Sequence, residues 1–150
     1  MNIMQFLAAC AQIAFGAAAI WIACLQWKLS KNKSKFEVYE KRYDAYKGLS
    51  NFLGSVVKNG AVETQELVSF HWKFEEHYYL FGQDVHDYVK LIFEKSLEFK
   101  GYGNQLQGIN SLPQGEERNA VVNKQDEILG WLLNQVEEKK KRFEKYLRIE

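Results

Sequence analysis

The sequence begins with a long apolar stretch that is followed directly by lysines. From Ile3 to Trp27 no side chain carries a charge. The lysines that follow are Lys28, Lys31, Lys33 and Lys35. A helix needs roughly 20 apolar residues to cross the hydrocarbon layer of a bilayer, which is about 30 Å thick. The sequence therefore predicts a transmembrane anchor over residues 1–28, followed by a basic juxtamembrane segment over residues 29–35.

The charge distribution around this stretch predicts its orientation. A secretory signal peptide carries positive charge before its apolar core, whereas only Met1 and Asn2 precede this one. Cleavage after the small residues 17–19 is an alternative, as is a buried core helix. Because the lysines follow the span, the positive-inside rule places the C-terminal side in the cytoplasm. We expect an uncleaved single-pass protein with its N-terminus outside and its C-terminal domain cytoplasmic.

A stripe of small and amide side chains runs along the predicted span. Its members recur at alternating steps of four and three residues: Gln5, Ala9, Gln12, Gly16, Ala19, Ala23 and Gln26. Small residues let transmembrane backbones approach closely, and side-chain amides hydrogen-bond between helices. The 3.5-residue period favours a left-handed bundle. We expect a homo-oligomer packed along this stripe, for example a tetramer. Two alternatives are a stripe that lines a narrow wet path and a chance pattern in an alanine-rich helix.

The rest of the chain has the composition of one folded domain. The chain has a net charge of +1, 47% hydrophobic residues and a single proline, which is typical of a globular protein rather than a disordered tail. Apolar residues recur at helical spacing. The predicted fold class is all-α, with one N-terminal transmembrane helix followed by a cytosolic bundle of about four helices over residues 36–150.

The expected helices of this domain cover residues 35–58, 64–81, 84–100 and 116–147. The first has an apolar face at Phe36, Tyr39, Tyr43, Tyr46, Leu49, Leu53 and Val56. It can continue directly from the span, and Asn59-Gly60 should end it. Thr64 and Asp84 are the predicted N-caps of the next two helices. A glycine-rich loop from Gly101 to Gly115 precedes the last helix, whose charge run from Glu137 to Arg142 is expected to be a solvated face with acids and bases paired four residues apart.

The histidines and carboxylates of the second and third helices suggest a metal site, but their spacing does not support it. Only His71 and Glu75 have the spacing of a helical ligand pair, and no HExxH motif accompanies them. His77 and His86 lack a comparable partner. We expect no metal and no cofactor. The sequence also lacks the GxSxG and kinase motifs, so no enzymatic function is expected.

Two further segments have a structural and a binding interpretation. The aromatic-rich segment from Phe70 to Phe81 has more apolar surface than one helix stripe needs, which favours a core helix whose second face meets another subunit. Stacking of its rings on bases is the alternative. The segment from Gly101 to Gly108 matches neither a P-loop nor a dinucleotide fingerprint. It is expected to be a flexible connector, with phosphate binding as the alternative.

Three stretches resemble short bacterial single-span proteins of unknown function that have a helical cytosolic domain. The first comprises Phe36-Glu37, Lys41-Arg42-Tyr43 and Tyr46. The second comprises Tyr79-Leu80-Phe81-Gly82, Val85 and Tyr88, and the third comprises Phe143 and Tyr146-Leu147. This resemblance implies a fold and a place in the bacterial inner membrane. The architecture is also similar to small membrane effectors of antiviral defence, including the type III CRISPR effectors, which bind a cyclic oligoadenylate in a cytosolic domain and then disturb the membrane.

We therefore expect a non-enzymatic homo-oligomer whose cytosolic domain senses a ligand or partner and alters the membrane span. The expected partners are the lipid bilayer, further copies of the chain and a cyclic oligonucleotide, but no duplex nucleic acid. Cations for such an anionic ligand are expected at Lys33, Lys35, Lys41, Arg42 and Lys47. The alternative is a passive anchor or scaffold that tethers a cytosolic partner protein through its aromatic surface.

Overall fold

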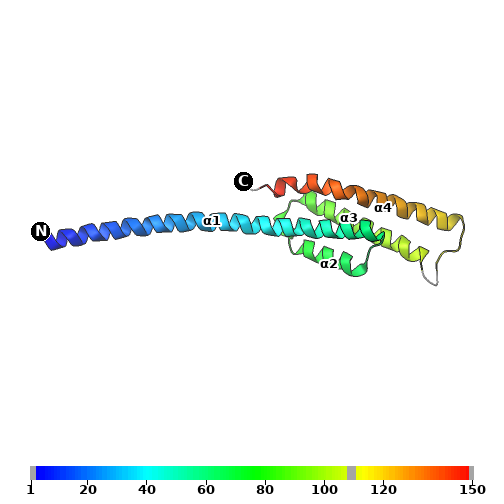
Figure 1. Cartoon of the computed structure of the whole chain (residues 1–150), viewed down its shortest axis with the longest axis horizontal. Helices are drawn as coiled ribbons and strands as arrows, with labels where there is room; N and C mark the ends of the chain where they lie inside the picture. The colour runs from blue at the N-terminus through cyan, green and yellow to red at the C-terminus, as the bar shows by residue number, and fades with distance from the viewer. Residues whose placement is uncertain (1–2, 108–110, 149–150) are drawn as a thin grey trace. The chain divides into compact units, whose positions relative to one another are not determined.

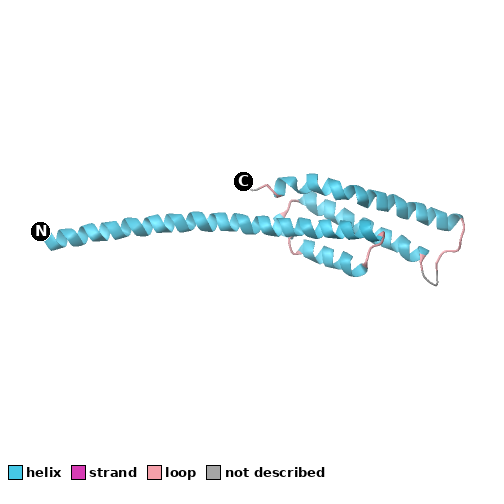
Figure 2. Cartoon of the chain, in the orientation of Figure 1, coloured by secondary structure: helices cyan, strands magenta, loops and turns pink. Residues whose placement is uncertain are grey.

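The computed structural model describes residues 3–107 and 111–148, and for residues 5–11 it describes the backbone only. Within these ranges the protein is helical and has no strand, which confirms the all-α prediction (Figures 1 and 2). The α-helices are α1 (Ile3–Asn59), α2 (Thr64–Glu75), α3 (Gln83–Leu106) and α4 (Glu116–Phe143). Two short 3-10 helices, η1 (Tyr78–Leu80) and η2 (Glu144–Tyr146), follow α2 and α4.

The chain divides into two compact units, Met1–Val38 and Tyr39–Glu150, and α1 contributes to both. In the first unit, the described large apolar side chains of α1 are exposed, from Ile13 (73% exposed) to Trp27 (70% exposed). Among the described residues, α1 is the one helix that is long and apolar enough to cross a membrane, judged by length and composition.

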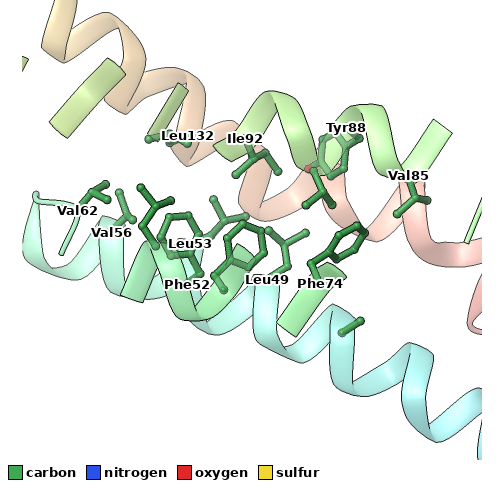
Figure 3. Close-up of a cluster of buried hydrophobic side chains, with 14 of the residues drawn as sticks. Leu49, Phe52, Leu53, Val56, Val62, Phe74, Val85, Tyr88, Ile92 and Leu132 are labelled. Carbon is green, nitrogen blue, oxygen red and sulfur yellow. The ribbon is translucent and has the colours of Figure 1, made fainter. Parts of the chain in front are cut away.

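The second unit is a bundle of four helical segments, in which consecutive helices run in opposite directions (Figure 1). From Ala45 onward, α1 supplies one wall of its core, because apolar residues at steps of three and four lie on one face of a helix. Leu49, Leu53 and Val56 are fully buried there, whereas Tyr43 remains half-exposed. Figure 3 shows the three buried side chains of α1 together with Val62 from the loop after α1 and with residues from the other three helices: Phe74, Val85, Tyr88, Ile92 and Leu132.

The predicted end of α1 is confirmed. The helix stops at Asn59, and Gly60 adopts a positive φ of 60° while its amide donates a hydrogen bond to Val56 O at 2.9 Å. A left-handed residue after the last helical turn satisfies a free carbonyl in this way, and glycine adopts it without steric penalty.

The second helix is shorter than predicted, because α2 ends at Glu75 and not at Phe81. His77 Nδ1 lies 2.8 Å from Lys73 O, the carbonyl that the amide of residue 77 would use in a continuing α-helix. The His77 amide instead donates to Phe74 O. The chain then makes the 3-10 turn η1 and turns the Phe81 ring into the core. The predicted N-cap is also wrong, because Thr64 is already helical and Glu63 occupies the cap position.

The third helix extends further than predicted. It begins at Gln83 after Gly82, so Asp84 lies in its first turn, and it continues through Gly101 to Leu106. Each helical glycine costs about 1 kcal/mol relative to alanine, but packing against α4 compensates. Phe99 is buried in the core, and Lys100 Nζ donates to Val62 O at 2.9 Å. The loop that follows is therefore shorter than predicted, and its residues 108–110 lie outside the described ranges.

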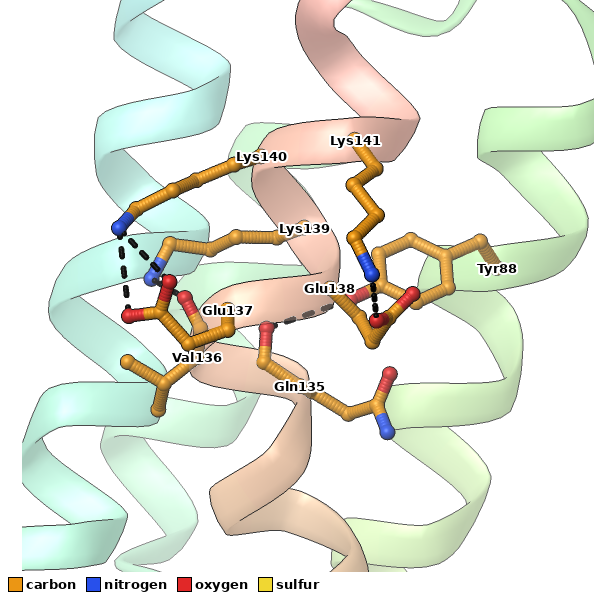
Figure 4. Close-up of polar contacts among 8 residues, drawn as sticks. All are labelled: Tyr88, Gln135, Val136, Glu137, Glu138, Lys139, Lys140 and Lys141. Atoms are coloured by element: carbon orange, nitrogen blue, oxygen red, sulfur yellow. Dashed lines mark hydrogen bonds and ion pairs between the residues drawn. The ribbon is translucent and has the colours of Figure 1, made fainter.

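The charge run near the end of α4 is only partly solvated. Glu137 pairs with Lys140 at 2.9 Å and Glu138 pairs with Lys141, so the partners are three residues apart and not four (Figure 4). Lys139 is only 5% exposed, and its Nζ donates to Val136 O at 3.0 Å. The prediction of a uniformly solvated face is therefore wrong at Lys139.

Candidate functional site

The predicted stripe of the span is open in the single chain. Its described members Gln12, Gly16, Ala19, Ala23 and Gln26 are all exposed. A Cβ placed on Gly16 would meet no described atom within 4 Å. The side chains of Gln5 and Ala9 lie outside the described residues. The stripe thus has room for a neighbouring helix along its described length.

The predicted cations for an anionic ligand are distributed over both units of the chain. Lys33 and Lys35 belong to the first unit, and Lys41, Arg42 and Lys47 to the second. The four lysines are exposed. Lys33 Nζ lies 3.8 Å from Glu37 Oε1, an exposed pair of small energetic value.

Arg42 differs from these lysines because it is bonded within its own domain. Its Nε donates to Leu80 O at 2.9 Å, and its Nη1 donates to Tyr146 O at 3.3 Å. The guanidinium carbon also lies 5.5 Å from the centre of the Tyr146 ring. These contacts join α1 to η1 and η2, so the structure gives Arg42 a role in holding the domain together.

The second unit contains a cavity of about 400 Å³ between α2, η1 and α3. Small-molecule sites in proteins commonly have volumes of this order. Its lining residues come from two sides. The side of α2 and η1 contributes His71, Phe74, Glu75 and Tyr78, and the side of α3 contributes Gln83, His86, Asp87, Val89, Lys90, Phe93 and Glu94. Both sets of residues follow helical spacing, because antiparallel helices present the i, i+3, i+4 and i+7 positions to each other.

Two pairs of rings in contact, one stacked and one tilted, connect α2–η1 with α3 along this cavity. The imidazole of His71 stacks on Phe93 with centroids 4.4 Å apart, and Tyr78 lies on His86 with centroids 3.9 Å apart. His86 and Phe93 are two helical turns apart, so the pairs are separated by about 10 Å along α3. Between them Phe74 and Val89 form the buried side of the cavity.

The rim of the cavity is acidic. Glu75, Asp87 and Glu94 contribute carboxylates, and Lys90 is the one lysine among the described lining residues. Lys90 Nζ lies 3.9 Å from Glu94 Oε1, and Gln83 donates a hydrogen bond to Asp87 Oδ1 at 2.9 Å. Three carboxylates and one ammonium group leave the rim with an excess of negative charge.

His86 is held by ring contacts. Its Nε2 atom is buried and has no hydrogen-bond partner among the described residues. Tyr78 covers one side of the imidazole, and Phe74 meets it edge-on with centroids 5.6 Å apart. The sequence alone suggests either a metal ligand or an ordinary partly buried or surface histidine at this position. Among the described residues no three histidine, cysteine or acidic side chains converge on a common point.

A second groove, of about 550 Å³, lies between α1 and α2. It is lined mainly by small and polar residues, and Ser55 there donates a hydrogen bond to Glu66 Oε2 at 2.6 Å. Its two rings, Phe52 and Phe70, are buried and stack on each other with centroids 4.7 Å apart, and its charged lining residues are one acid and one base, Glu66 and Lys73. The smaller cavity therefore has the more selective chemistry, and we take it as the candidate binding site.

Comparisons of this chain with models of known protein families, with curated proteins and with solved structures find no match. Its function is therefore inferred from its own residues.

Proposed function

We propose that this chain is a single-span membrane protein whose helical domain senses a ligand or partner in the cytoplasm and alters the span. The observation that carries this proposal is the division of α1. The same helix exposes its apolar residues along the predicted span and buries Leu49, Leu53 and Val56 in the domain. Exposing so much apolar surface to water is costly at about 25 cal/mol per Å², and lipid would remove that cost.

Homo-oligomerisation is the second part of the proposal. The open stripe of small and amide residues on α1 supports it, because such surfaces pack transmembrane helices together. In an oligomer, a change in the cytosolic domain reaches the span through α1, which belongs to both. The most specific form of the proposal is a bacterial antiviral effector that disturbs the inner membrane, and the support for that form is the architectural resemblance.

Cysteine labelling in intact cells tests the topology. In a background without Cys10 and Cys24, we would introduce Asn2→Cys or Asn134→Cys and apply a membrane-impermeant maleimide. The proposal expects Asn2→Cys to react in intact cells and Asn134→Cys to react only after lysis. A protein that remains in the supernatant after membranes are sedimented would contradict the membrane assignment, and the reverse labelling would contradict the orientation.

The mass of the full-length protein in nanodiscs tests the assembly and the sensing role. We would measure it alone and with a panel of cyclic oligonucleotides. A defined oligomer that changes mass or subunit number with a ligand agrees with a sensor. A monomer that retains none of them would favour the passive anchor.

The passive scaffold is the second candidate function, and the outer face of α2 and η1 favours it. Val68 and Trp72 (63% exposed) lie four residues apart on α2, and Tyr79 (95% exposed) lies on η1. Large exposed aromatic side chains are common anchors of protein interfaces. A scaffold would lose its partner when Trp72 and Tyr79 become alanine, and it would tolerate changes in the stripe of the span.

A further inference from the structure

We propose that the cavity between α2, η1 and α3 binds an aromatic organic cation. The first support is its shape and lining. A volume of about 400 Å³ accepts a molecule with one or two rings. Phe93 stacks on the imidazole of His71, Tyr78 lies tilted against the imidazole of His86, and Phe74 lies between the two pairs. Aromatic side chains of this kind attract a planar ring by stacking and a cation by its interaction with the ring face.

The second support is the charge of the rim. The cavity presents three carboxylates to a ligand, those of Glu75, Asp87 and Glu94. The lysine of the rim, Lys90, already lies beside Glu94. Complementary charge favours a cationic ligand and penalises an anionic one. A phosphate-bearing ligand would bring its charge against these carboxylates. The cavity therefore differs in preference from the exposed lysines of α1, which are the candidates for an anion.

An aromatic cation would be the ligand of the sensing role proposed above. That role is needed only for the effect of binding on the span, and not for binding itself. A bound ligand would add contacts between η1 and α3, which already meet through the rings of Tyr78 and His86. Binding itself is a property of the cavity and is measured separately from membrane insertion and subunit number.

The test uses three probes that share one ring and differ in charge: benzamidine, benzamide and benzoate. Each is titrated into the full-length protein in nanodiscs of zwitterionic lipid, with empty nanodiscs as the blank, and the heat of binding is recorded. We expect saturable binding of benzamidine, weaker binding of benzamide, and benzoate weakest of the three. Equal or tighter binding of benzoate would overturn the proposal, as would the absence of saturable benzamidine binding to the folded protein.

Matched variants locate the site. Glu75→Gln and Glu94→Gln should each weaken benzamidine binding about threefold, the effect of losing one exposed charge pair, and leave benzamide binding unchanged. Glu76→Gln is the control, because Glu76 is the C-cap residue directly after Glu75 and does not line the cavity. If Glu76→Gln weakens benzamidine as much as Glu75→Gln, the cation binds elsewhere and the assignment fails.

A second matched pair tests the rings. Tyr78→Ala should abolish benzamidine binding, whereas Tyr79→Ala should leave it unchanged, because Tyr79 is almost fully exposed and outside the cavity. A thermal melt shows whether each variant is folded. If Tyr78→Ala is unfolded, Glu75→Gln and Glu94→Gln test the location of the site instead. Benzamidine binding with an unchanged subunit number would retain the site and remove the sensing role. An inserted oligomer that does not bind benzamidine would remove the site and retain the membrane function.

Discussion

The hydroxyl oxygen of Tyr146 accepts a hydrogen bond from the backbone amide of Gly82, with the two atoms 2.8 Å apart. The same hydroxyl donates to Asp84 Oδ1 at 2.8 Å, and Lys145 Nζ lies 3.1 Å from Asp84 Oδ2. The C-terminal turn η2 is thereby fastened to the start of α3, 62 residues earlier in the chain. His86, which lines the cavity, donates its backbone amide to Gly82 O at 3.4 Å, so the bonds of Tyr146 help to fix one end of the cavity.

The close approach at Gly82 predicts that alanine is not tolerated there. A Cβ at this position would collide with the Tyr146 hydroxyl. Gly82→Ala should lower the free energy of unfolding by about 1–3 kcal/mol, the usual effect of overpacking, measured by denaturant unfolding of the full chain in detergent micelles. Gly101→Ala is the matched control. It lies inside α3, a Cβ there meets no described atom within 4 Å, and the change should raise stability by about 0.5–1 kcal/mol. A loss at Gly101 as large as that at Gly82 would contradict this account.

The contact between Tyr146 and Asp84 predicts a pH dependence of stability. The hydrogen bond from Tyr146, with a smaller contribution from Lys145, lowers the pKa of Asp84 below 3.8. A carboxyl group whose pKa is lower in the folded state stabilises the fold above its unfolded pKa, and the contribution disappears as the pH falls through the folded pKa. Tyr146→Phe should therefore cost about 1 kcal/mol near pH 7, and the difference from wild type should narrow below pH ~3.8. Unfolding curves from pH 7 to pH 2 measure this difference. A difference that stays constant over that range would show that the bond to the carboxylate contributes little.

The buried Lys139 predicts a substitution that stabilises the domain. Its ammonium group has a backbone carbonyl as hydrogen-bond partner, and burial lowers its pKa below 10.5. The folded state therefore disfavours the charged form of Lys139, and this lowers the stability of the fold at every pH below the pKa of the folded state. The loss of stability becomes smaller as the pH rises from that pKa towards 10.5. Lys139→Met should raise stability by about 1 kcal/mol at pH 7, with a smaller gain at high pH.

The exposed Lys141 is the control for this substitution, since its ammonium pairs with Glu138 in water. Lys141→Met should change stability by less than about 0.5 kcal/mol. If Lys139→Met proves more destabilising than Lys141→Met, the aliphatic stem and the bond to Val136 O outweigh the penalty of the buried charge.

Local sequence patterns were sufficient for the helices whose boundaries are set locally. The end of α1 follows from Gly60 and from the spacing of Leu49, Leu53 and Val56, each visible in a short window of sequence. The end of α2 is different, because it depends on the His77 side chain bonding to Lys73 O and on a buried place for Phe81. Helix propensity gives no information on whether the core has room for the Phe81 ring.

The glycines of α3 show the same limit. Gly101 and Gly103 predict an interruption, but Phe99 is buried in the core and Lys100 donates a hydrogen bond to Val62 O in the loop between α1 and α2. These contacts with distant parts of the chain keep the segment helical. Tertiary contacts commonly override propensity in this way.

The candidate site could not be predicted from local sequence patterns, because each of its two ring pairs joins residues from different elements. One sequence feature points to it in retrospect. His71 and Tyr78 are seven residues apart, and so are His86 and Phe93. Two ring-bearing positions at a two-turn spacing on each of two antiparallel segments place the rings opposite one another. The charge of the rim follows from the sequence only once this pairing is known.

The stripe on α1 predicts that one face of the span controls assembly. Gly16→Leu adds a large side chain to the stripe, where a neighbouring backbone is expected to approach closely, and should convert the oligomer to smaller species in nanodiscs. Ala14→Leu is the matched control. At about 100° per residue it lies roughly opposite Gly16 on the helix, where lipid would cover the added side chain. Native mass spectrometry of both variants gives the subunit number directly, and membrane sedimentation shows that each is still inserted.

Loss of the oligomer in Gly16→Leu alone agrees with packing along the stripe. Equal loss in both variants, or in neither, would show that the four- and three-residue pattern is a chance product of an alanine-rich helix.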